Sequence, residues 1–112
     1  MKYFNITTTT TTDLIAKGDA NTFEGVVKQI TICNVDDQTA NNVDLFLEDA
    51  AASASTNASN NKYHILKNVD IPVGATILLD SNLNFDASAL NLRITTTNAA
   101  DTGAGKLTVI IK

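Results

Sequence analysis

The stretch that decides the fold class is Val26-Val27-Lys28-Gln29-Ile30-Thr31-Ile32-Cys33-Asn34-Val35, in the first third of this 112-residue chain. Alternate residues of the stretch share a face. One face carries Val26, Lys28, Ile30 and Ile32, and the other carries Val27, Gln29, Thr31 and Cys33. A period of two residues is that of a β-strand. The stretch is therefore predicted to be a strand of a half-buried sheet.

The same alternation recurs further along the chain. Val43, Leu45 and Leu47 face one way, and Asp44, Phe46 and Glu48 face the other. The pattern returns in residues 90–95 and 107–112, and turn residues separate the segments at the spacing of about 8 to 12 residues that sandwiches show. No segment has the 3.6-residue period of an amphipathic helix. The sequence predicts an all-β fold: a single antiparallel β-sandwich or jelly-roll-like domain of seven to eight strands.

The first residues are predicted to be extended. Six consecutive threonines, Thr7 to Thr12, suit a solvated strand better than a helix. We therefore divide the chain into residues 1–16, an extended N-terminal arm or first strand, and residues 17–112, the β-sandwich domain. An arm of this kind can add a strand to the open sheet edge of an adjacent subunit, the alternative being a disordered tail. The predicted partner-binding residues are Tyr3, Phe4, Ile6, Thr8 and Thr10.

Small and polar residues mark the connections between strands. Ala50–Asn61 has no apolar side chain larger than Ala and is predicted to be a loop. A break is expected near Asn68. Pro72 lacks a main-chain donor and is expected at an edge or a strand end, followed by a turn at Gly74. Asn98–Gly105 is predicted to be the last turn.

Composition narrows the classes of partner. The chain has 16 Thr and 13 Asn but only 18% charged residues, with a formal net charge of −4. No basic footprint exists for nucleic acid or anionic lipid. No signal peptide is recognisable, and no apolar run approaches the roughly 18 residues of a membrane span. Cys33 is the only cysteine, so no intrachain disulfide can form. These features predict a protein made in a cytoplasm that binds neither nucleic acid nor membrane.

The residue types that most catalytic sites need are scarce, with one His, one Cys and one Arg. His64 has no second ligand at metal spacing and Cys33 has no predicted base, so both are predicted to be structural. The acidic residues considered for calcium are Asp36, Asp37, Asp44, Asp80 and Asp86. They lack the spacing of a calcium loop and are predicted to cap turns. We predict no catalytic, cofactor-binding or metal-binding residues, no cofactor and no enzymatic activity.

Several segments give the chain a family resemblance. Val27–Asn34 followed by Val43–Leu47 is similar to a pattern in small tailed-bacteriophage virion proteins. So is Tyr63–Asp80, in which a strand, an Ile-Pro-x-Gly turn and a strand ending in Asp follow one another, together with Leu90–Ile94. The resemblance covers roughly residues 23 to 111. It implies a β-sandwich or jelly-roll structural protein of a phage particle, such as a capsid decoration (cement) protein, which is often trimeric. No individual functional residue transfers with it.

The leading hypothesis is therefore a virion structural protein, made in the cytoplasm of the bacterial host. Its expected partners are the major capsid protein or other virion subunits, and it is expected to be a homo-oligomer, with a trimer favoured. Many weak contacts made by one bridging protein add up to stable attachment. One alternative is a neck or tail component, an adaptor or fibre. Another is a carbohydrate-binding adhesive module, which the absence of Trp and the scarcity of Tyr disfavour.

Overall fold

The computed structural model describes residues 1–18, 26–36, 39–49, 62–96 and 107–112, in which strands are the only regular secondary structure. Within these ranges, no helix has the length and apolarity needed to span a bilayer. The strands are β1 (Lys2–Ile6), β2 (Thr12–Ile15), β3 (Val26–Val27), β4 (Ile30–Asn34), β5 (Asn41–Glu48), β6 (Lys62–Ile71), β7 (Thr76–Leu79), β8 (Leu83–Asn84), β9 (Asn91–Thr96) and β10 (Leu107–Ile111).

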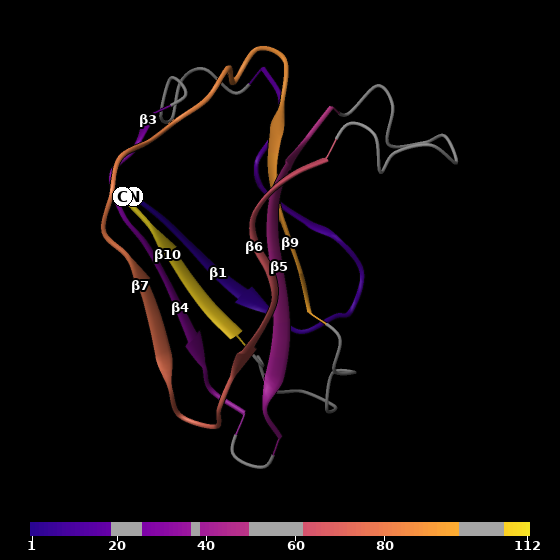
Figure 1. Cartoon of the computed structure of the whole chain (residues 1–112), viewed down its shortest axis with the longest axis vertical. Coiled ribbons are helices and arrows are strands. Elements are labelled where there is room, and N and C mark those ends of the chain that lie inside the picture. The colour runs from indigo at the N-terminus through magenta and orange to yellow at the C-terminus, as the bar shows by residue number, and fades with distance from the viewer. Residues whose placement is uncertain (19–25, 37–38, 50–61, 97–106) are drawn as a thin grey trace.

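Eight of these strands form two four-stranded antiparallel sheets that face each other (Figure 1). Sheet A has the order β1-β10-β4-β7, sheet B has the order β2-β9-β5-β6, and β3 pairs with β8. The pairings are nested: β1 with β10, β2 with β9, β3 with β8, β4 with β7 and β5 with β6. The chain is thus doubled back on itself between β5 and β6, and the doubled ribbon is wrapped into a sandwich, as in a jelly roll. The predicted all-β antiparallel fold is confirmed.

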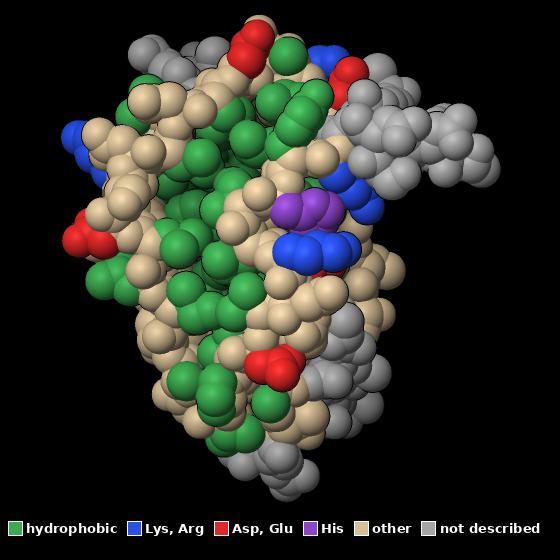
Figure 2. Space-filling view, viewed as in Figure 1, with side chains coloured by type: hydrophobic (Ala, Val, Ile, Leu, Met, Phe, Trp, Pro, Cys, Tyr) green, Lys and Arg blue, Asp and Glu red, His purple; other side chains and the backbone are tan. Residues whose placement is uncertain are grey.

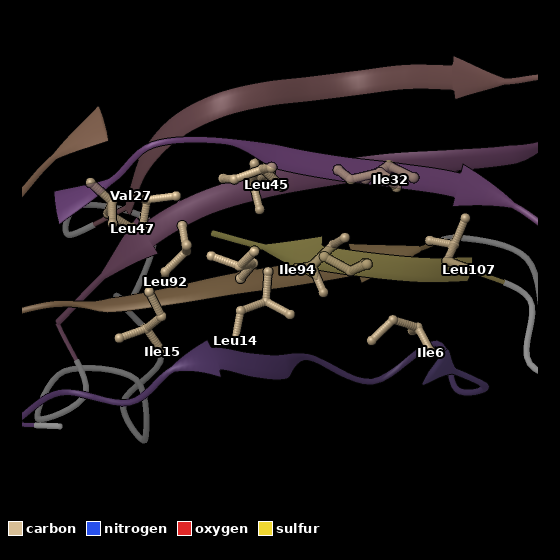
Figure 3. Packing of buried hydrophobic residues seen from close by; sticks show 14 of the residues in the cluster. Ile6, Leu14, Ile15, Val27, Ile32, Leu45, Leu47, Leu92, Ile94 and Leu107 are labelled. Atoms are coloured by element: carbon tan, nitrogen blue, oxygen red, sulfur yellow. The ribbon is translucent and has the colours of Figure 1, made fainter. Parts of the chain in front are cut away.

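The core between the sheets is aliphatic (Figure 3). Ile32 and Val109 of sheet A and Leu45, Leu92 and Ile94 of sheet B are all fully buried. Burying a side chain of this size contributes about 1.5–3 kcal/mol. Isoleucine and valine also suit the pleated surface of a strand, because branching at Cβ already restricts χ1 and leaves little rotamer freedom to lose. The sandwich is therefore filled although aromatic residues make up only 5% of the chain.

The predicted alternation is confirmed in the strands that form the core. The buried residues that it placed on one face are Ile30, Ile32, Val43, Leu45, Leu47, Leu92, Ile94, Leu107, Val109 and Ile111. The assignment is wrong at Val26 and Val27, because Val26 is 42% exposed and Val27 is buried. Two strands, β3 and β4, cover this stretch, and Lys28 and Gln29 lie between them. The alternation changes phase across that interruption.

β6 is a single strand with irregular pairing. Its register with β5 shifts twice. Asn68 has a φ of 53°, in the left-handed region that Asn tolerates better than most residues, and its N–H donates to Oδ1 of Asp44 at 2.7 Å. The break expected near Asn68 is thus an irregularity within a continuous strand. Pro72 follows the end of β6, as predicted, and Gly74 has the positive φ of the predicted turn. The predicted loop 50–61 and the predicted turn 98–105 lie outside the described residues.

The N-terminal segment belongs to the sandwich of its own chain. β1 is an edge strand of sheet A paired with β10, and β2 is an edge strand of sheet B paired with β9. Of the two expectations for residues 1–16, an arm or a first strand, the structure therefore has strands. Ile6, which was expected to bind a partner, is 2% exposed and lies in the core. Pairing with β10 explains this correction, because the pleat of β1 turns Phe4 and Ile6 inward and Tyr3 and Asn5 outward.

One buried amide joins the two sheets where β4 leads towards β5. Asn34, the last residue of β4, is fully buried. Its Nδ2 donates to the main-chain oxygens of Ile71 at 2.9 Å and Thr39 at 3.1 Å. Its Oδ1 accepts from the N–H of Asp36 and from Nδ2 of Asn41, both at 3.0 Å. The side chain therefore ties the end of β4 to the end of β6, the start of β5 and the connection between the sheets.

The main chain of the same residue completes this network. The N–H of Asn34 donates to the main-chain oxygen of Ala75 at 2.9 Å, and its carbonyl accepts from the N–H of Gly74 at 3.0 Å. Thr96 extends the network to β9, since its Oγ1 donates to Oδ1 of Asn41 at 2.8 Å. Every polar group of Asn34 has a partner, as a buried amide requires.

We predict that Asn34→Ala lowers the free energy of unfolding by about 2–4 kcal/mol, because it leaves several buried donors and acceptors without partners. Asn84→Ala is the matched control. Asn84 is exposed in the short strand β8, and its loss should change stability by no more than about 0.5 kcal/mol. Urea denaturation of the two variants measures the difference. Equal losses would show that the buried amide does not hold the sheets together.

Candidate functional site

The two outer faces of the sandwich differ in charge. Alternate residues of a strand point away from the core, so the register of each sheet defines its outer face. On sheet A, the outward residues are Tyr3, Asn5, Thr31, Cys33, Thr76, Leu78, Thr108 and Ile110. On sheet B, the outward residues include Asp13, Asp44, Phe46, Glu48, Lys62, His64, Arg93 and Thr95. We name the first set the sheet A face. It carries no charged side chain, whereas the opposite face carries several.

Four neighbouring residues, one from each strand, form a row across the sheet A face, and the residues at both ends of this row are apolar. Strand pairing places Tyr3 beside Ile110, Ile110 beside Thr31, and Thr31 beside Leu78. Tyr3 is 68% exposed and Leu78 is 55% exposed. Contact with another protein would remove water from hydroxyl and apolar groups here, which costs far less than desolvating ions. The row is therefore suited to a protein interface, whose buried centre is typically poor in charge and rich in aromatic residues.

The opposite face is occupied by its own ion pairs. Arg93 donates from Nε to Oδ1 of Asp13 and from Nη1 to Oε1 of Glu48, both at 2.5 Å. Nζ of Lys62 lies 3.9 Å from Oε2 of Glu48. Burial alone would lower the pKa of the Arg93 guanidinium, but the hydrogen bonds and charges of Glu48 and Asp13 outweigh it and raise that pKa above its ordinary value. The side chain of Glu48 is only 4% exposed, so these cations compensate a buried charge.

The single histidine packs over an aromatic ring on the same face. Phe46 is 2% exposed although it points away from the core. The His64 ring lies 5.5 Å from it between centroids, and Nζ of Lys62 lies 4.9 Å from the Phe46 centroid, within range of a cation–π interaction. Figure 2 shows the histidine at the surface of the molecule. His64 and Lys62 therefore cover Phe46, which explains how an aromatic residue on an outer face is buried.

The flank between β6 and β7 is hollowed. A hollow of about 290 Å³ is lined by Ile30, Ile65, Leu78, Leu79, Asp80, Ser81, Asn82 and Leu83. Figure 2 shows hydrophobic side chains in a band along this flank of the sandwich. Among the described residues, this lining combines aliphatic side chains with Asp80, Ser81 and Asn82 and includes no aromatic ring on which a sugar would stack.

The predicted partner-binding residues divide between surface and core. Tyr3 lies on the sheet A face, and Thr8 and Thr10 are exposed between β1 and β2 with their Oγ1 atoms 3.1 Å apart. Phe4 is half-buried and packs against the core, and Ile6 lies within it. Three of the five side chains are thus accessible to a partner.

Sequence reasoning missed the neighbours of Tyr3 on the sheet A face. Leu78 and Ile110 join it only through pairings between residues more than 30 positions apart in the chain. Within Thr76–Leu79, three apolar residues follow one another, so no alternation of polarity indicated that Leu78 is the exposed one. The available signal was the alternation of Leu107–Ile111, which places Ile110 on the outward side.

In the described part of the chain, no group of three or more His, Cys, Asp or Glu residues is placed to hold a metal ion. Cys33 lies on the sheet A face and His64 on the opposite face, so the structure does not bring these two together. Asp36 accepts the N–H of Thr39 through Oδ1. Asp37 lies outside the described residues.

Of the remaining acidic candidates, Asp86 bonds within its own turn as predicted, whereas Asp44 and Asp80 bond to residues distant in the chain. Asp44 accepts the N–H of Asn68, and Asp80 accepts from the side-chain amide of Gln29 at 3.4 Å. Asp86 accepts from both the hydroxyl and the N–H of Ser88, and these hydrogen bonds lower the pKa of Asp86 below its ordinary value.

Comparison with known proteins adds no relative, because the chain matches no protein-family model, no curated protein and no solved structure. The sheet A face is therefore the candidate functional site on its own geometry.

We predict that Arg93→Met lowers the free energy of unfolding by about 2–4 kcal/mol, since it leaves the buried Glu48 with Lys62 alone. Adding Glu48→Gln should recover part of the loss, because the unpaired charge is then gone. Lys17→Met is the control: it breaks an exposed ion pair with Asp49 and should cost at most about 1 kcal/mol. Chemical denaturation checks all three, and a double variant no more stable than Arg93→Met would contradict this account.

Proposed function

We propose that this chain is a non-enzymatic structural protein of a phage particle, a capsid decoration protein that binds the major capsid protein and stabilises the head shell as a homotrimer. It is made in the host cytoplasm and resides in the virion. The resemblance of several strand and turn segments to small phage virion proteins suggests this class. The jelly-roll strand order is compatible with it, since viral capsid domains are among the proteins built this way.

The observation that carries the proposal is the uncharged sheet A face with its row Tyr3, Ile110, Thr31 and Leu78. A decoration protein contacts the shell through a limited area at each subunit and gains stability from binding several subunits at once. Each contact must therefore form at low desolvation cost, which favours hydroxyl and apolar groups over ions. The ion-paired face of sheet B is the one expected to remain in solvent.

A neck or tail position would use the same face, because the chemistry of the surface does not depend on which virion subunit it meets. The decoration role and the neck or tail role differ in where the protein is located in the particle. Co-sedimentation with candidate capsid shells, and separately with tails, measures it directly. Binding to shells together with a higher melting temperature of the shell supports the decoration role. Binding to tails alone, or a monomer that binds neither, would overturn it.

We predict that Thr31→Lys weakens shell binding at least tenfold, because it places a charge in the middle of the sheet A face, where burial leaves it unpaired. Thr95→Lys is the matched control. Both threonines are half-buried on central strands, but Thr95 lies on the outer face of sheet B, beside Asp44. A titration of shells with each variant gives the affinities. Equal weakening by the two variants, or none by Thr31→Lys, would exclude the sheet A face as the contact.

A further inference from the structure

We propose that copies of this chain join edge to edge, with β1 of one copy pairing antiparallel with β7 of the next, so that sheet A continues from subunit to subunit. The inference deepens the homotrimer of the proposed function by naming the strands that join. It depends on the edges of sheet A alone, so that its test needs no capsid shell.

No described strand pairs with the outer edge of β7, and this edge presents a defined set of main-chain groups. The hydrogen bond from the N–H of Asn34 to the oxygen of Ala75 fixes the phase of pairing between β4 and β7. In an antiparallel pair, the residues whose N–H and C=O point to the neighbour alternate with residues whose groups point away. The groups that point away from β4 are therefore those of Thr76 and Leu78.

The main-chain groups on the outer edge of β1 are identified in the same way. The N–H of Lys112 donates to the oxygen of Gln29, which sets the phase between β10 and β4. Residues 108 and 110 then point their main-chain groups to β4, and residues 107, 109 and 111 point theirs to β1. The groups of β1 that point away from the sheet are those of Tyr3 and Asn5.

Sheets avoid further pairing by placing charges, bulges and prolines at their edges, and the edge strands of sheet A have one such feature, Lys2 at the start of β1. The pairing of β1 with β10 and of β7 with β4 is regular, and residues 3–6 and 76–79 carry no charge. Both edges of sheet B differ. The register of β2 shifts next to Asp13, and β6 shifts twice and includes Lys62, Lys67 and Asp70. The edges of sheet B are therefore better protected against strand addition than those of sheet A.

The two free edges of sheet A fit each other. Directions alternate across β1, β10, β4 and β7, so that β1 of a second copy placed beside β7 runs antiparallel to it. Aligning the outward groups sets Tyr3 opposite Leu78 and Asn5 opposite Thr76 as hydrogen-bonded pairs. On the sheet A face, an apolar residue thus meets an apolar residue and a polar residue meets a polar residue, and each of these two pairs contributes about 0.2–1 kcal/mol.

The same register matches the inward side chains. It sets Phe4 opposite Ile77, and both are half-buried residues that pack against the rim of the core. Joining the edges would bury them further and continue the core between subunits. The strands also match in length, five residues for β1 and four for β7. Since one chain carries both complementary edges, a second copy is the partner that they fit.

Proline substitutions at the outward positions test the joint. Leu78→Pro and Asn5→Pro each remove one N–H that points away from the sheet, and leave the pairing within the chain intact. Leu78→Ala and Asn5→Ala are matched controls that lose the same side chains but keep the N–H. Circular dichroism and thermal unfolding confirm that each variant is folded. If a proline variant is unfolded, Leu78→Lys or Asn5→Lys replaces it, since charge protects an edge.

Light scattering over a range of concentrations should give the wild type a mass that is a small multiple of 11.9 kDa. Each proline variant should be monomeric, and each alanine control should keep the oligomer. An equimolar mixture of the two proline variants should give a dimer of one copy of each, because the mixture contains one intact β1 edge and one intact β7 edge that still fit.

A wild type that is monomeric at every concentration overturns the inference, as does an oligomer that survives both prolines. Loss of the oligomer with Leu78→Pro but not with Asn5→Pro would show pairing of β7 with β7 across a two-fold axis, and would also overturn it. An edge-joined oligomer that ignores both shells and tails would leave this inference standing and remove the proposed function.

Discussion

The buried amide of Asn34 is the interaction on which the architecture depends. A jelly roll has few local contacts to hold its two sheets in register, because the chain passes from one sheet to the other at almost every connection. Asn34 acts at the point where two of these passages, from β4 to β5 and from β6 to β7, lie next to each other. An apolar residue here would pack but would not specify position. The directional hydrogen bonds of the amide allow one arrangement of the ends of β4 and β6 and the starts of β5 and β7. In the low dielectric of the core, a polar group left without its partner is costly.

That constraint acts on the whole sandwich through strand register. A slip of one residue in β4 would turn Ile30 and Ile32 outward and place Thr31 and Cys33 in the core. The hydrophobic pattern already disfavours the slipped register, because two isoleucines would leave the core. The amide adds a second penalty, because only the native register brings Asn34 to its partners. Apart from the β5–β6 pair, the nested pairings join residues far apart in the chain, so register errors are not corrected by neighbouring turns.

The sequence predicted the core residues wherever one face of a strand is buried and the other is exposed to solvent. Alternation identified the core residues of β4, β5, β9 and β10, because burial on one side is what produces alternation. Alternation did not predict burial where side chains of neighbouring strands also cover the outer face. Phe46 and Glu48 were assigned outward and do point outward, yet both are buried beneath side chains of neighbouring strands. Asn34 gave no signal, since an asparagine after a strand is indistinguishable from one in a turn. The sheet A face was out of reach because only register assembles it.

The distribution of charge follows from these constraints and links fold to surface. A chain with few charged residues cannot protect every edge and face, and the ion pairs among Asp13, Glu48, Lys62 and Arg93 lie on sheet B. There they compensate the buried Glu48, cover Phe46 and accompany the irregular edges β2 and β6. Sheet A is left regular in its pairing and uncharged on its outer face, and Lys2 is the one charged residue of its edge strands. In a monomeric protein such a sheet is an aggregation hazard. In a protein whose working state is an assembly, the same sheet is the part that the assembly covers, and its lack of charge is then a requirement of the interface.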